Sequence, residues 1–355
     1  MNNILVTGHK GYIGSVLTEM LRERSFQVSG YDTDYYDGCA IDAAGPVFPE
    51  IRKDIRDVSI EDLRGIDAVV HLAALSNDPL GELNPGLTEE INLNGAIRLA
   101  RCAKAAGVRR FVYASSQSMY GISGTDRELE EDSSEKNPLT AYAKTKWDAE
   151  CALQTMNSPD FTIVCFRPST VFGAGPKLRC DIVFNNLVAC AFTTGRIEIK
   201  SDGTPWRPVV HVRDVSSAFI AGLTAPEALV SGQSFNVGIT DGNFTVRDLA
   251  EAAQRSVPGS SLVFTGEHGS DSRTYKVSFK KILSVLKDYY RPEWDLDRGG
   301  RELVELFRRV RFSKEHFQGK HCTRLKQLRY LLETRRIDEN LRWIKAPQPL
   351  CPTNS

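Results

Sequence analysis

Short apolar runs rich in β-branched residues alternate along the first half of the chain with segments whose apolar positions recur at helical spacing. The strand-like runs are residues 4–7, 27–31, 67–72, 110–114 and 162–166. Two helical patterns, 90–106 and 140–155, lie between the third, fourth and fifth of these runs. Strands that alternate with helices predict βαβ units and a parallel sheet covered on both faces.

The rhythm changes after residue 167, where strand-like and helical pieces mix. The strand-like pieces are 208–212, 234–237 and 262–265, and the helical ones are 182–194, 246–256 and 276–288. We therefore predict an α/β fold, a Rossmann-type doubly wound parallel sheet with a smaller interleaved α+β lobe. The Rossmann-type domain is expected to cover residues 1–167, and residues 208–235 are expected to return to it. The smaller lobe is expected to cover residues 168–297. Residues 298–355 form a basic helical extension, whose charge-rich helix at 324–336 is expected to face solvent.

Composition narrows the possible functions. The 355 residues carry a formal net charge of +0, which gives no electrostatic case for binding nucleic acid or a membrane surface. No apolar run approaches the roughly 18 residues that span a bilayer, and the N-terminus runs straight into a strand pattern without a secretory signal. Eight cysteines show no C-x-x-C pair, so no metal site is expected and a reducing cytoplasm fits best.

A glycine-rich turn follows the first strand-like run. Gly8, Gly11 and Gly14 fall in G-x-x-G-x-x-G spacing before a helix pattern. Such glycines allow a tight turn and let a pyrophosphate approach the backbone at a helix start, which is typical of a dinucleotide site. Asp32, at the end of the second strand, is expected to accept hydrogen bonds from the adenosine ribose hydroxyls. It would repel a 2′-phosphate, so the sequence favours NAD over NADP.

Residues suited to acid–base chemistry follow the fourth strand. Ser116 lies just beyond that strand, and Tyr142 and Lys146 lie in Y-x-x-x-K spacing on the 140–155 helix. Residues four apart share a helix face, so the Lys146 ammonium is expected beside the Tyr142 phenol, where it would lower the phenol pKa. We expect Tyr142 to act as a general base on a substrate hydroxyl that also bonds to Ser116.

Five motifs, in order along the chain, resemble the extended short-chain dehydrogenases that modify nucleotide sugars. They are the glycine turn at 7–14, HLAA at 71–74, SSQSMYG at 115–121, YAKTK at 142–146 and FRPSTVFG at 166–173. The resemblance covers residues 1 to about 310. It implies catalytic roles for Ser116, Tyr142 and Lys146 and NAD binding by the 1–167 domain. The implied cofactor contacts are Gly8, Gly11, Tyr12, Ile13, Gly14, Asp32, Asp54, Ile55, Leu72, Ala73, Ala74, Tyr142, Lys146 and Pro168.

The second lobe resembles the same family in its substrate-binding segments. The implied ligand is a nucleotide-diphosphate sugar, and the implied contacts are Ser118, Asn186, Leu187, Arg207 and Arg273. Two arginines suit a diphosphate because guanidinium offers forked, charge-assisted donors. The family also forms homodimers through helices that correspond to 90–106 and 140–155, so a homodimer is expected here.

The residues after Ser116 bear on the reaction. Sugar 4,6-dehydratases of this family carry carboxylates there, whereas this chain has Gln117 and Ser118. The sequence therefore favours a nucleotide-sugar epimerase that oxidises C4 transiently. A 4-ketoreductase remains an alternative, although Asp32 disfavours NADPH. A dehydratase that draws an acid from Asp78 or Glu82 also remains, and a dinucleotide-sensing binding module is the non-enzyme alternative.

Overall fold

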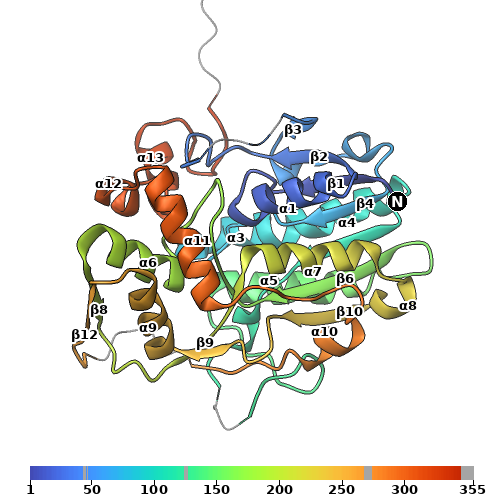
Figure 1. The fold of residues 1–355 in the computed structure, drawn as a ribbon. Helices are drawn as coiled ribbons and strands as arrows, with labels where there is room; N and C mark the ends of the chain where they lie inside the picture. The colour runs from blue at the N-terminus through green and yellow to red at the C-terminus, as the bar shows by residue number, and fades with distance from the viewer. Residues whose placement is uncertain (43–44, 46, 124–126, 268–273, 345–355) are drawn as a thin grey trace, which may run out of the picture.

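The central element is a seven-stranded, wholly parallel sheet in the order β10-β6-β5-β4-β1-β2-β3 (Figure 1). This computed structural model describes residues 1–42, 45, 47–123, 127–267 and 274–344. The order reverses between β1 and β4, so the carboxyl ends of these strands open a crevice of the kind that binds dinucleotides. The predicted Rossmann-type fold is confirmed. The strands are β1 (Asn3–Thr7), β2 (Gln27–Asp32), β3 (Glu50–Arg52), β4 (Ala68–His71), β5 (Arg110–Ala114), β6 (Thr162–Pro168) and β10 (Gln233–Val237).

Helices cover both faces of this sheet (Figure 1). Side chains alternate along each strand, so Ile4 and Val6 pack into one core while Leu5 packs into the other. The first core includes α1 (Tyr12–Glu23) and α7 (Val212–Thr224). The second includes α4 (Gly95–Ala105) and α5 (Ala141–Gln154). Burying each aliphatic side chain fully stabilises the fold by about 1.5–3 kcal/mol. All four residues of β4 are buried: three are apolar, and the fourth, His71, is hydrogen-bonded to the Thr7 hydroxyl.

The second lobe contains two small sheets. β9 (Trp206–His211) lies between β7 (Thr170–Phe172) and β11 (Asn243–Thr245), and β12 (Ser261–Phe264) pairs with β8 (Arg196–Ile199). Its helices α6 (Val183–Thr194) and α9 (Val246–Ser256) pack together and lie to the left of the central sheet in Figure 1. Of residues 208–235, which were expected to return to the first domain, α7 packs on the central sheet and the start of β10 is a strand of it. β9, in contrast, belongs to a small sheet of the second lobe.

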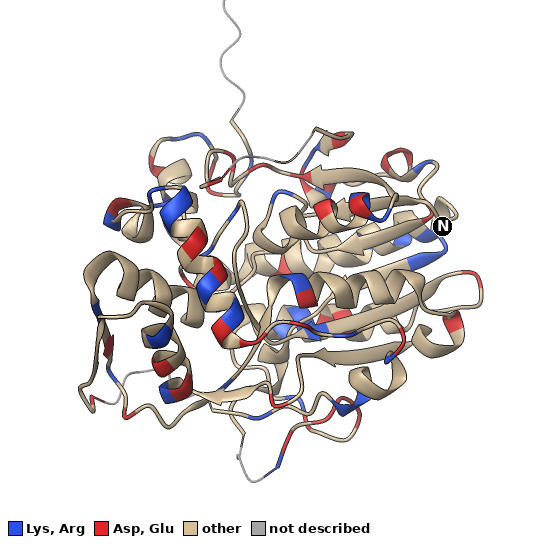
Figure 2. Cartoon of the chain, in the orientation of Figure 1, with Lys and Arg blue, Asp and Glu red and all other residues tan. Residues whose placement is uncertain are grey.

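The C-terminal extension differs from the solvent-facing helix that was expected. It contains α11 (Leu296–Arg309), α12 (Lys314–Gln318) and α13 (Arg324–Glu333). Figure 2 shows acidic and basic positions alternating along α11, yet α13 buries Leu328 and Leu331 against the second core. Ile337 and Leu341, beyond α13, join the same core next to Tyr35. The end of the extension, from α13 onward, is therefore packed onto the domain of the central sheet, whereas α11 and α12 contact helices of the second lobe.

The remaining elements are short. Where one helix over 90–106 was expected, a π-helical turn at Glu89–Asn94 precedes α4. The other helices are α2 (Asp78–Gly81), α3 (Pro85–Thr88), α8 (Glu227–Val230) and α10 (Lys280–Val285), with 3-10 turns at Ile55–Asp57, Ile60–Leu63 and Gln117–Tyr120. Within the described residues, no helix has both the length and the apolar character to cross a membrane.

Candidate functional site

The glycine turn brings strand β1 and helix α1 close together. Gly8 has a φ of +73°, and a Cβ atom there would lie 2.8 Å from the backbone nitrogen of Ala73. A Cβ atom on Gly14 would lie 2.2 Å from the carbonyl oxygen of Gly8. Gly11 caps α1 without any side-chain hydrogen bond. The positive end of α1 therefore faces the pocket uncapped by a side chain, as an anion such as a pyrophosphate requires.

Asp32 lies in the same pocket with its carboxylate held in place. One oxygen accepts a hydrogen bond from the backbone N–H of Lys10 at 3.0 Å, and the other from that of Asp34 at 3.0 Å. Burial raises the pKa of Asp32, and these two hydrogen bonds act in the opposite direction. The side chain is thus oriented at the end of β2, where an adenosine ribose would lie.

The expected adenine contacts also line the cavity. Asp54 accepts two hydrogen bonds from the Arg56 guanidinium, at 2.7 and 3.0 Å, and one from the Arg56 backbone N–H at 2.9 Å, and together these hold the pKa of Asp54 below its usual value despite burial. Ile55 is almost wholly buried beside it. The strand-end residues Leu72, Ala73 and Ala74 line the cavity together with Tyr12, Ile13 and Pro168. All the expected cofactor contacts therefore lie around one cavity of about 460 Å³, a size suited to a small-molecule ligand.

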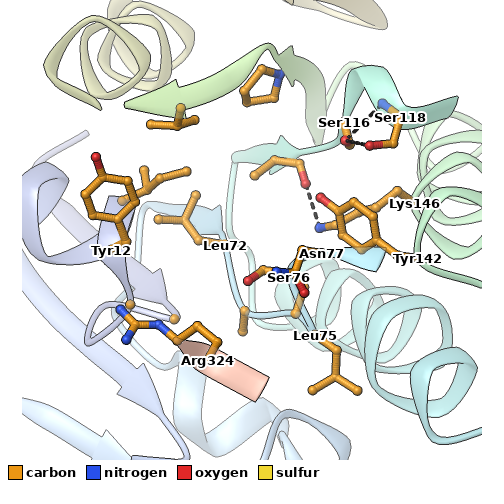
Figure 3. Close-up of a pocket in the computed structure, with 18 of the residues that line it drawn as sticks. Tyr12, Leu72, Leu75, Ser76, Asn77, Ser116, Ser118, Tyr142, Lys146 and Arg324 are labelled. Carbon is orange, nitrogen blue, oxygen red and sulfur yellow. Dashed lines mark hydrogen bonds between the residues drawn. The ribbon is translucent and has the colours of Figure 1, made fainter. Parts of the chain in front are cut away.

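Ser116, Tyr142 and Lys146 converge at the other end of this cavity (Figure 3). Thr140 caps α5 by accepting a hydrogen bond from the backbone N–H of Ala143, which places Tyr142 and Lys146 on the first two turns. The Tyr142 phenol lies near the Ser116 hydroxyl, which favours the ionised form of the phenol and so acts to lower its pKa. The Lys146 amine donates to the carbonyl oxygen of Ala114 at 2.8 Å. The expected catalytic residues are thus brought together by α5 and the end of β5.

The protonation of this group differs from the expectation. Burial raises the pKa of Tyr142 to about 12, and the nearby Ser116 hydroxyl opposes this shift only in part. Burial also lowers the pKa of Lys146 to about 7. Desolvation outweighs the expected pairing because the lysine amine bonds to a backbone carbonyl instead of the phenol. A cationic nicotinamide ring would favour the phenolate in this pocket.

The residues after Ser116 provide no carboxylate. Gln117 turns its amide inward and donates to the carbonyl oxygen of Arg167 at 2.9 Å, while Ser118 bonds to Ser116 at 3.1 Å. Of the two acids considered as substitutes, Asp78 lines the cavity and Glu82 does not. Glu82 instead accepts a hydrogen bond from the backbone N–H of Ala141 at the start of α5.

Only some of the expected substrate contacts line the cavity. Arg207 lines the cavity, whereas Asn186 and Leu187 do not. Asn186 is exposed and donates to the carbonyl oxygen of Cys180, and Leu187 packs into the core. Asn185, one position earlier and about 100° away around the helix, is buried and accepts a hydrogen bond from the backbone N–H of Gly173. Arg273 lies outside the described residues.

Several lining residues were not identified from the sequence. Arg179 and Asp181 form a two-point ion pair, at 2.8 and 3.0 Å, directly before α6. The sequence signal that could have identified them is an arginine and an aspartate two positions apart, just before a helix. Arg324 also lines the cavity although it belongs to α13, more than 140 residues further along the chain. No local pattern could have located it, because its position depends on how the extension packs.

Known proteins with similar sequences and structures identify the family of this chain. The profile of the NAD dependent epimerase/dehydratase family matches residues 4–238. A UDP-glucose 4-epimerase of Mycolicibacterium smegmatis is 30% identical over 86% of this chain and 98% of its own, and a mouse dTDP-D-glucose 4,6-dehydratase is 28% identical over 86% and 88%. The structure of MoeE5 in complex with UDP-glucose and NAD superposes with a TM-score of 0.73, at 27% identity over 87% of this chain and 99% of that one. The chain belongs to the NAD-dependent epimerase/dehydratase family.

Proposed function

We propose that this protein is a nucleotide-sugar epimerase that inverts its substrate through a transient 4-keto sugar. The proposal is carried by the environment of Ser116, where Gln117 and Ser118 provide neither an acid nor a base near neutral pH. An epimerase needs a proton acceptor at the C4 hydroxyl and a cofactor that is regenerated within each turnover. A tyrosine, a lysine and a bound NAD would satisfy both requirements.

The side chains take distinct roles in this reaction. Tyr142 removes the proton of the C4 hydroxyl, and Ser116 holds the same oxygen by a hydrogen bond. When bound, NAD supplies the hydride acceptor that oxidises C4 and the donor that reduces it again. Lys146, whose pKa of about 7 allows it to gain or lose a proton near neutrality, assists proton exchange with Tyr142. Inversion requires the 4-keto sugar to turn within the pocket before it is reduced.

Two groups suit the remaining parts of the ligands. Asp32 would repel a 2′-phosphate by roughly 4 kcal/mol at a separation of ~4 Å and an effective dielectric constant of ~20, so the cofactor is NAD and not NADP. Arg207, which lines the cavity from β9, suits the diphosphate of the sugar nucleotide. The M. smegmatis 4-epimerase and the MoeE5 complex with UDP-glucose support a UDP-sugar as the first substrate to test.

A dehydratase is the second candidate, because Asp78 lines the cavity and acts electrostatically on Tyr142. Asp78 already accepts a hydrogen bond from the Thr140 hydroxyl at 2.6 Å, which orients its carboxylate. Such a residue could protonate a departing C6 hydroxyl. A 4-ketoreductase is disfavoured by Asp32, because such enzymes usually draw hydride from external NADPH.

A substrate panel tests the proposal. The purified protein would be incubated with UDP-, dTDP-, GDP- and CDP-sugars, and the products would be identified by NMR. We expect one nucleotide sugar to give its C4 epimer without net NADH. Loss of water would establish the dehydratase instead, and stoichiometric NADH accumulation would contradict both. The predicted homodimer through α4 and α5 is tested separately by light scattering.

A further inference from the structure

Arg324, the first residue of α13, is a buried charge without a carboxylate partner. Its side chain is only 2% exposed. It donates to the carbonyl oxygens of Lys177 at 2.6 Å and His321 at 3.3 Å, and it stacks over the ring of Tyr36 at 4.6 Å. Among the described residues, no carboxylate lies within the 4.0 Å ion-pair distance of this guanidinium. Burying an uncompensated charge is costly, so a ligand anion is the expected counterpart.

A second buried guanidinium lies nearby. Arg179 is 8% exposed, pairs with Asp181 and donates to the Ser76 hydroxyl at 3.1 Å. Burial and the neighbouring charge of Arg179 together lower the pKa of Arg324. The two cations face one cavity with the single carboxylate of Asp181 paired to only one of them. The Asp181 charge acts on Arg324 as well, but without an ion pair between them.

The position of these arginines along the cavity identifies the anion. The Arg179 charge acts on both Tyr12, at the start of α1, and Tyr142, at the catalytic end. Arg324 contacts Tyr36, in the loop that follows Asp32. Figure 3 shows Arg324 at the end of the pocket that holds Tyr12, away from Ser116 and Ser118. Tyr12 begins α1, and the N-terminal end of this helix is where the pyrophosphate of a dinucleotide would lie.

The extension is fixed to the loop after β2 by hydrogen bonds that hold α13 in place. Gln327 donates to the carbonyl oxygen of Tyr35 at 3.0 Å, and the Trp343 indole donates to that of Thr33 at 2.6 Å. Arg342 forms an ion pair with Asp54 at 3.5 Å. These contacts surround the residues that line the adenosine end of the cavity. Arg324 therefore enters the pocket from a rigidly docked element.

We propose that Arg324, together with Arg179, binds the pyrophosphate of the dinucleotide cofactor. The uncapped start of α1 would face the phosphates from one side and the two guanidiniums from the other. Guanidinium suits this task because its planar donors match two phosphate oxygens at once. The C-terminal extension is then part of the cofactor site. This inference depends on the family cofactor and not on the sugar reaction proposed above.

The test compares ligands with and without phosphates. Arg324→Gln and Arg324→Lys would be made in the full chain, with Arg329→Gln as the matched control, since Arg329 is exposed on the same helix. Dissociation constants for NAD, ADP, adenosine and UDP would be measured by calorimetry or competition after bound cofactor is removed. Circular dichroism and melting temperature would establish that each variant is folded.

The expected pattern is specific to a phosphate contact. Arg324→Gln should raise the dissociation constants of NAD and ADP by about 10- to 100-fold, the range for loss of a charge-assisted hydrogen bond. The dissociation constant of adenosine should change by no more than about twofold. Arg324→Lys should recover part of the loss, and Arg329→Gln should change nothing. Equal losses for NAD and adenosine would overturn the proposal, because Arg324 would then only shape the pocket. Weaker binding of UDP with unchanged binding of NAD would also overturn the proposal, because Arg324 and Arg179 would then bind the substrate.

Discussion

Lys146 allows the effects of one residue on activity and on stability to be separated, because burying its charge lowers the stability of the fold while its proposed role is in the reaction. Its side chain is 3% exposed, and its amine has one hydrogen bond, to the carbonyl oxygen of Ala114. Burial lowers its pKa from 10.5 to about 7. We predict that Lys146→Met, which keeps the length of the side chain, abolishes turnover and yet makes the cofactor-free protein more stable near neutral pH.

The magnitude follows from the pKa difference between the folded and unfolded chain. The unfolded lysine holds its proton up to its ordinary pKa, so the folded form is penalised most below about pH 7 and not at all above the unfolded pKa. At about pH 6 the penalty is roughly 5 kcal/mol, and at about pH 10 it is roughly 1 kcal/mol. Leaving the Ala114 carbonyl without its donor costs about 1–3 kcal/mol in the variant. The net gain is therefore about 2–4 kcal/mol at about pH 6, and it disappears by about pH 10.

Urea unfolding of both proteins at several pH values measures this difference. Both must be free of cofactor, since a ligand that binds only the folded state would raise stability by itself. Lys144→Met is the control, because Lys144 is exposed on the same helix and should have no pH-dependent effect. A variant that is less stable than the wild type at about pH 6, or a difference that grows with pH, would refute the reasoning.

Three further variants test the cofactor and catalytic assignments. Tyr142→Phe should reduce turnover to background while the NAD content of the purified protein, measured by absorbance after denaturation, stays unchanged; retained activity would exclude Tyr142 as the base. Asp32→Ala should narrow the preference for NAD over NADP in equilibrium binding, and an unchanged ratio would remove its assigned role at the ribose. Gly14→Ala should abolish NAD binding in a folded protein, because the new Cβ would lie 2.2 Å from the Gly8 carbonyl oxygen; normal binding would show that the turn can move.

Sequence patterns could predict the parts of the molecule that depend on local rules. Apolar strands between helical patterns indicated the sheet, and the spacing of Gly8, Gly11 and Gly14 indicated how β1 meets α1. The Tyr142–Lys146 spacing placed both side chains on one face of α5. These features require only helix periodicity and strand alternation, so neighbouring residues contain the necessary information.

Other parts depend on long-range packing and could not be predicted in this way. The charge pattern of α13 suggested a solvent-facing helix, but its apolar side is covered by the loop after β2, which brings Arg324 into the pocket. The burial that shifts the pKa values of Tyr142 and Lys146 could not be predicted either, because residue spacing indicates proximity and not burial. The sequence alone could not show that Asn185 is buried and Asn186 exposed, because one residue turns a helix position by about 100° and the packing of α6 decides which side is covered.

The fate of the hydrogen at C4 tests the proposed reaction most directly. The substrate identified in the panel would be prepared with deuterium at C4 and converted by the enzyme, and the product would be examined by NMR and mass spectrometry. An epimerase that oxidises C4 transiently predicts that the deuterium remains at C4 of the inverted sugar, with no change in mass. Deuterium found at C6 of a sugar that has lost water would contradict the account and identify a 4,6-dehydratase.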